Sequence, residues 1–250
     1  MPQVMVLLDR SDAIPVRLPA GLSLRALWEA ELICADLEPC GGTGPRLGCS
    51  GADAESADVM SGATLAALDD ALRDPFLWTW LDGRQFGAIT MAAALSTFVL
   101  CGPGGPQSLT AKLVGARTDP TVVIPLGRAP GAATGRVAIV WDGPAMRKTV
   151  DAILPLLRRA RTVELVVPDA ARAVIATALR FLETRGIRAV PRPLAAGAAV
   201  LETYLRRYSS WRRADWCVLG RQHSPSTIGA LSGVLARIVA EPACPLIIGG

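Results

Sequence analysis

Apolar runs alternate with amphipathic stretches through the second half of the chain. Residues 136–141 form a continuous apolar run that ends at Asp142, which is typical of a buried parallel strand followed by a turn. Apolar residues then recur at three- and four-residue intervals from Met146 to Leu157, which predicts an amphipathic helix. The same pattern predicts further strands at 162–167, 187–191, 215–219 and 245–248, and further helices at 169–186, 195–211 and 228–240. Strands that alternate with helices predict a parallel sheet covered on both faces.

The first half follows the same plan with more interruptions. A strand is predicted at 4–8, and Pro15 and Pro19 separate it from a helix predicted at 24–37. Gly, Ser, Asp and Ala dominate a predicted insertion at 40–57. The remaining predicted elements are helices at 63–72 and 84–95 and strands at 76–81, 97–101 and 121–126. Residues 127–135 have the composition of a linker, so we expect domains at 1–127 and 136–250.

Composition and charge limit the classes of function. Apolar residues make up 51% of the 250 residues, enough for two cores. No apolar run reaches the roughly 18 residues of a membrane-spanning helix, and the chain starts without a basic leader, so a cytoplasmic protein without a membrane partner is expected. The formal charge of +4 is dispersed, which argues against nucleic-acid binding.

The cysteines and the single histidine argue against a metal site. The six cysteines include no Cys-x-x-Cys pair, and the only histidine is His223. Cys101, Cys217 and Cys244 lie in predicted strands and are expected to be buried, whereas Cys40 and Cys49 flank a loop-like glycine segment.

Two segments share one glycine spacing. Gly102 and Gly105 are followed, after nine residues, by Gly115-Ala116. Gly220 and His223 are followed, after nine residues, by Gly233-Val234. Each segment begins after a short apolar run and precedes a second one, so the chain has the pattern of a tandem duplication. A glycine turn between a strand and a helix allows backbone N–H groups to approach a phosphate.

With these residues placed, the chain resembles the universal stress protein family in its two-domain form. The family motif is Gly-2x-Gly-9x-Gly-(Ser/Thr), preceded by an aspartate at the end of the first strand. The first copy matches this motif at Asp9, Gly102, Gly105 and Gly115 and departs from it at Ala116. The second copy matches it at Asp142, Gly220 and Gly233 and departs from it at His223 and Val234.

The resemblance implies an α/β fold of two tandem Rossmann-like domains, similar to the adenine nucleotide alpha hydrolases. Each domain is expected to hold a five-stranded parallel sheet of order 3-2-1-4-5. In the family, the fifth strands of two domains pair antiparallel. Residues 121–126 and 245–248 are the corresponding apolar runs, so an internal pseudo-dimer is expected, and a homodimer is left open.

The resemblance also implies a site for ATP or another adenine nucleotide. The candidate residues are Asp9, Gly102, Gly105, Gly115, Asp142, Gly220, His223 and Gly233. The first copy is expected to be the better site, because glycines leave its phosphate path free of side chains, whereas His223 obstructs the second. Two plain alternatives stay open: the glycines serve only a tight turn, and Asp9 and Asp142 are helix N-caps.

Enzymatic functions lack the required residues. No Gly-x-Gly-x-x-Gly dinucleotide-binding motif follows the first strand of either half. No Ser/His/Asp or Cys/His catalytic set is possible beyond the single histidine. We therefore expect no catalytic residues and a non-enzymatic stress-response or regulatory protein that acts through ligand or protein binding. The alternative is an ATP-binding protein with slow ATPase activity.

Overall fold

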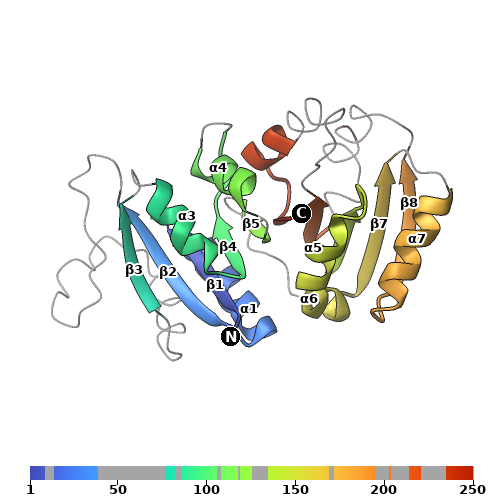
Figure 1. The fold of residues 1–250 in the computed structure, drawn as a ribbon, viewed down its shortest axis with the longest axis horizontal. Helices are drawn as coiled ribbons and strands as arrows, with labels where there is room; N and C mark the ends of the chain where they lie inside the picture. The colour runs from blue at the N-terminus through green and yellow to red at the C-terminus, as the bar shows by residue number, and fades with distance from the viewer. Residues whose placement is uncertain are drawn as a thin grey trace. The chain divides into compact units, whose positions relative to one another are not determined.

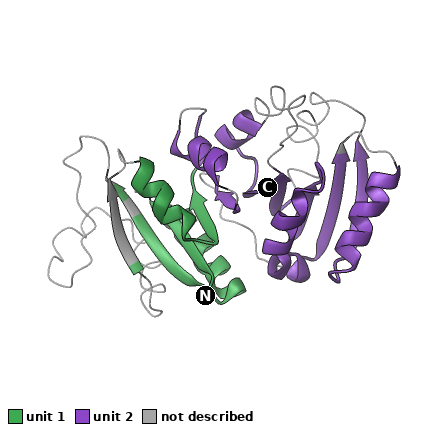
Figure 2. Cartoon of the chain, in the orientation of Figure 1, with its two compact units in different colours: residues 1–102 green, residues 103–250 purple. Residues whose placement is uncertain are grey.

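A computed structural model describes residues 1–8, 14–38, 77–82, 86–105, 108–117, 119–125, 135–168, 172–194, 203, 214–220 and 235–249. The chain divides into two compact units, residues 1–102 and 103–250 (Figure 2). Several predicted features lie outside the described residues: the 40–57 insertion, the 63–72 helix, nearly all of the 195–211 helix, and nearly all of the linker.

The described residues of unit 1 form four parallel strands. Its elements along the chain are β1 (Gln3–Leu8), α1 (Ile14–Trp28), β2 (Glu31–Glu38), β3 (Leu77–Asp82), α3 (Phe86–Ala94) and β4 (Phe98–Cys101). The strands follow the order β3-β2-β1-β4, so β1 lies between β2 and β4. Residues 4–8 of β1 are all buried, which explains why this strand is a continuous apolar run. In Figure 1, α3 lies over the near face of these strands.

The predicted helix at 24–37 is wrong in its second half. Helix α1 ends at Trp28, and residues 31–38 form β2, paired in register with β1 from Gln3 opposite Glu31. Glu29 has φ of 50°, a left-handed conformation that ends the helix without the usual glycine. The helix also begins earlier than predicted and contains Pro19.

Unit 2 carries the remaining elements. These are α4 (Leu109–Ala116), β5 (Thr121–Val123), β6 (Arg136–Val140), α5 (Met146–Ala152), α6 (Leu154–Arg159), β7 (Thr162–Pro168), α7 (Arg172–Glu183), β8 (Ala189–Leu194), β9 (Trp216–Gly220) and β10 (Leu246–Gly249). The strand order is β5-β10-β9-β6-β7-β8. Strands β6 to β10 are parallel and follow the order 3-2-1-4-5 when numbered along the chain. The predicted α/β fold with parallel strands is confirmed.

The helices of unit 2 follow the sequence pattern closely. The helix predicted from Met146 to Leu157 is divided at Ile153, because Pro155 at the start of α6 has no N–H to continue the ladder. After α7 the chain turns through Gly186, whose φ of 76° is the left-handed conformation of a glycine C-cap. Helix α5 packs against β9 and β10, and α7 packs against β8 (Figure 1).

The predicted antiparallel pairing of the runs 121–126 and 245–248 is confirmed. Val122 of β5 lies opposite Ile247 of β10, and both side chains are fully buried. Cys101, Cys217 and Cys244 are buried, as expected, and burial raises the pKa of the Cys217 thiol well above its ordinary value of 9.0.

Candidate functional site

The carboxyl ends of β6 and β9 form the switch point of the unit 2 sheet. These two strands are neighbours, and the chain leaves them toward opposite sides of the sheet, which is where open α/β sheets bind ligands. Asp142 follows β6 by two residues, and Gly220 is the last residue of β9. A Cβ atom added to Gly220 would overlap the carboxylate of Asp142. The structure therefore brings together two predicted site residues, and only glycine leaves room for the carboxylate.

A second polar side chain lies beside this pair. Gly249 of β10 is in register with Gly220, and a Cβ atom added to it would lie 2.7 Å from Oγ1 of Thr149 on α5. Thr149 is 1% exposed. Two neighbouring strand ends thus carry glycines, each covered by an oxygen-bearing side chain. Neither Thr149 nor Gly249 was predicted from the sequence. The glycine directly after the apolar run 245–248 could have indicated a close approach of a side chain at this strand end.

Asp142 is held by the residue before it. The N–H of Trp141 donates to the carbonyl of Val166 at 2.8 Å, which extends the pairing of β6 with β7. The Trp141 ring is buried with its centroid 5.6 Å from that of Phe181 on α7. Helix α5 begins after Ala145 and has no side-chain cap, so Asp142 is not its N-cap.

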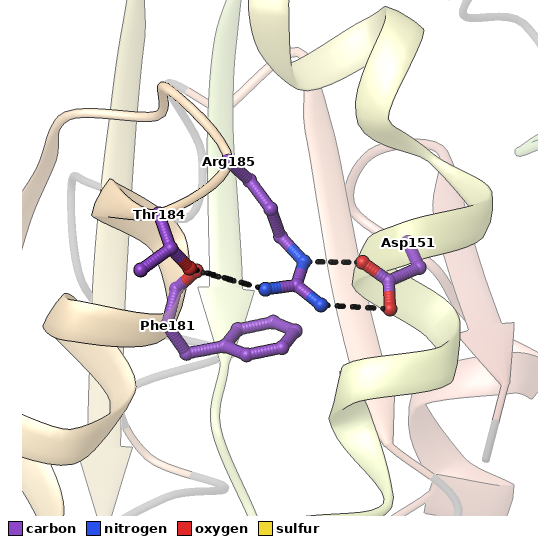
Figure 3. Close-up of polar contacts among 4 residues, drawn as sticks. All are labelled: Asp151, Phe181, Thr184 and Arg185. Carbon is purple, nitrogen blue, oxygen red and sulfur yellow. Dashed lines mark hydrogen bonds and ion pairs between the residues drawn. The ribbon is translucent and has the colours of Figure 1, made fainter.

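Phe181 is fixed in turn by an arginine (Figure 3). The Arg185 guanidinium lies over the Phe181 ring, 3.5 Å from its centroid, and forms a two-point ion pair with Asp151 that includes an Nη2–Oδ2 contact of 3.1 Å. Nη1 of Arg185 also donates to Oγ1 of Thr184. The hydrogen bond to Asp151 raises the pKa of Arg185 above its ordinary value. These contacts join the end of α7 to α5 on the face where Trp141 packs.

In the first copy, a cation lies at the described part of the strand end. Gly102 directly follows β4, and a Cβ atom added to it would lie 2.7 Å from Cζ of Arg17. Arg17, on α1, is 2% exposed, and its Nη1 donates to the carbonyl of Leu7 at 2.8 Å. The prediction that the glycines leave this turn free of side chains is therefore wrong at Gly102. Asp9 lies outside the described residues.

The remaining glycines of the first motif lie in unit 2. A Cβ atom added to Gly105 or to Gly115 would have nothing within 4 Å. The N–H of Gly104 donates to the carbonyl of Val239 at 3.2 Å. Ser108 caps α4 by accepting from the N–H of Ala111, so the electropositive end of this helix is at Ser108.

Gly115 lies at the other end of α4. It comes seven positions after Ser108, or roughly 10 Å along the helix at about 1.5 Å per residue. The structure therefore does not place Gly115 at the N-terminus of this helix. His223 and Gly233 of the second motif lie outside the described residues.

No metal-binding cluster and no membrane-spanning helix occur in the part of the chain that the structure describes. There, no group of three His, Cys, Asp or Glu side chains could hold a metal ion. None of the described helices combines the length and apolar character that crossing a membrane requires.

Solved structures share this fold along the whole chain. A universal stress protein from Archaeoglobus fulgidus superimposes with a TM-score of 0.60 at 12% identity, covering 99% of this chain and 95% of that one. A protein of unknown function from Pseudomonas aeruginosa PAO1 gives 0.60 at 14% identity, covering 100% and 92%. A third, from P. aeruginosa UCBPP-PA14 and provisionally assigned as a universal stress protein, gives 0.61 at 13% identity, covering 100% and 93%. No family model matches the chain, and no curated protein matches its sequence. At these identities the likeness establishes the fold.

Proposed function

We propose that this chain is a stress-response or regulatory protein of the universal stress type, which acts by binding a ligand or a protein and not by catalysis. The support is the combination of a fold shared over the whole length with universal stress structures and the arrangement of Asp142 on Gly220 at a strand-end switch point. The predicted domains at 1–127 and 136–250, the internal pseudo-dimer and the cytoplasmic location belong to the same proposal.

Within this proposal, the second copy holds the ligand site and an adenine nucleotide is the ligand. A carboxylate at the switch point accepts hydrogen bonds from hydroxyl groups such as those of a ribose. Asp142 as a whole is half-buried while both of its carboxylate oxygens are buried, so the carboxylate would meet a ligand only after a local rearrangement. In the first copy, the corresponding strand end carries the buried guanidinium of Arg17. This preference reverses the one that the glycine pattern suggested.

Isothermal titration calorimetry with ATP tests the ligand. We expect the wild-type protein to bind ATP, and we expect Asp142→Asn to weaken binding at least tenfold, because it removes a charged acceptor worth about 1.5–3 kcal/mol. The matched control is Glu183→Gln, which removes one carboxylate from the exposed surface of α7 and should leave the affinity unchanged. No binding by the wild-type protein at millimolar ATP would refute the nucleotide proposal.

A further inference from the structure

Arg17 occupies the switch point of unit 1. Strands β1 and β4 are neighbours, and the chain leaves β1 toward β2 on the opposite side. The Arg17 guanidinium bonds to Leu7, near the end of β1, and lies over Gly102, directly after β4. The side chain thus bridges the two strand ends between which an open α/β sheet places its ligand.

The two copies use the same position with opposite charge. In unit 2, the carboxylate of Asp142 lies on Gly220 after the strands β6 and β9. In unit 1, the guanidinium of Arg17 lies on Gly102 after the corresponding strands β1 and β4. Arg17 is 2% exposed and both carboxylate oxygens of Asp142 are buried as well, so the two groups differ in chemistry: a carboxylate accepts hydrogen bonds from hydroxyl groups, whereas a guanidinium only donates them.

We infer that Arg17 is a built-in occupant of the unit 1 strand end, that it makes glycine necessary at position 102, and that it excludes nucleotide from this unit. The exclusion rests on the proposed function, whereas the role of Gly102 does not. A nucleotide at this strand end would have to displace the guanidinium and so break its hydrogen bond to the Leu7 carbonyl. Arg17 therefore restricts binding to the second copy.

The position of Arg17 also explains why residue 102 is glycine, without a bound phosphate. The atoms that would meet a Cβ at position 102 are the end of a side chain, which ordinarily could move aside. Here that end is buried and hydrogen-bonded to the Leu7 carbonyl, so moving it breaks this bond. Gly105, three residues later, has open space and needs no such explanation.

A double-mutant cycle on thermal stability tests the inference. Gly102→Ala should lower the melting temperature by on the order of 5 °C, whereas the matched control Gly105→Ala should leave it within error. In an Arg17→Met background, which keeps an apolar side chain without the guanidinium, Gly102→Ala should cost little. An equal loss in both backgrounds, or an equal loss for Gly105→Ala, would overturn the inference.

A second variant keeps the test decisive if Arg17→Met does not fold. Arg17→Lys lacks the terminal nitrogens that overlap the Cβ position, so the loss caused by Gly102→Ala should be smaller than in the wild-type protein. The cycle contains no nucleotide, so it can succeed even where the proposed function fails. Binding of two ATP molecules by one wild-type chain would overturn the exclusion while leaving the nucleotide proposal intact.

Discussion

Glycines at the strand ends of this protein provide space for side chains of the same chain. Gly220 provides it for Asp142, Gly249 for Thr149, and Gly102 for Arg17. At each of these glycines, a polar side-chain atom lies too close to the place that an added Cβ would take. The need for glycine at these positions therefore follows from internal packing. The repeated glycines alone are therefore weak evidence for a phosphate site, and the carboxylate of Asp142 carries more of the functional argument.

Substitutions of Gly115 and Gly249 measure the difference between a glycine with open space around it and one that packing requires. Gly115 lies exposed on α4 with nothing within 4 Å of an added Cβ, so Gly115→Ala should stabilise the protein by about 0.5–1 kcal/mol through helix propensity. Gly249→Ala should instead destabilise it, because the Cβ would lie 2.7 Å from Oγ1 and 3.1 Å from Cγ2 of the buried Thr149. Chemical denaturation of both variants measures the two effects, and a destabilising Gly115→Ala would contradict the assignment of this residue to an open helix surface.

At the scale of elements, the sequence predicts best where the chain is fully buried or clearly periodic. Strands β1 and β6 are dominated by apolar runs, β7 is rich in β-branched residues, and α7 ends before a glycine, so each could be recognised. Strand β2 could not, because Glu29 gives no sign of the left-handed turn that ends α1. The contacts of Arg17 with Gly102 and of Thr149 with Gly249 join residues distant in sequence, so no local pattern announces them.

The left-handed turn at Glu29, which ends α1, can be tested by mutation. Its φ of 50° is strained for a residue with a Cβ, and its side chain is exposed, so Glu29→Gly should stabilise unit 1 by about 1 kcal/mol. Glu183→Gly, at the last residue of α7, serves as the control and should destabilise the protein. Unfolding by urea reports both changes. Destabilisation by Glu29→Gly would show that the turn is not left-handed.

At the scale of the whole molecule, the compact units do not coincide with the predicted repeat. Strand β5 was assigned to the first copy, yet it belongs to unit 2, because it pairs with β10 from Val123 opposite Leu246 to Thr121 opposite Ile248. The pairing covers an apolar edge of β10 that would otherwise be open to aggregation. The expected domains at 1–127 and 136–250 remain a prediction about the repeat.

The β5 to β10 pairing predicts a strong effect at its centre. Ile247→Asp would place a carboxylate opposite Val122 in a fully buried position, which should cost about 3 kcal/mol or more and sharply lower the melting temperature. Val190→Asp, on β8 and 49% exposed, is the control and should change it little. Comparable losses for the two variants, measured by calorimetry, would mean that β10 is not covered as described.

We propose that one chain offers a single nucleotide site, at Asp142 in the second copy. Native mass spectrometry of the protein titrated with ATP counts the bound molecules directly. We predict one ATP per chain, bound with unchanged affinity in Arg17→Lys and at least tenfold more weakly in Asp142→Asn. Two molecules per chain, one bound with undiminished affinity in Asp142→Asn, or none at all would contradict the account.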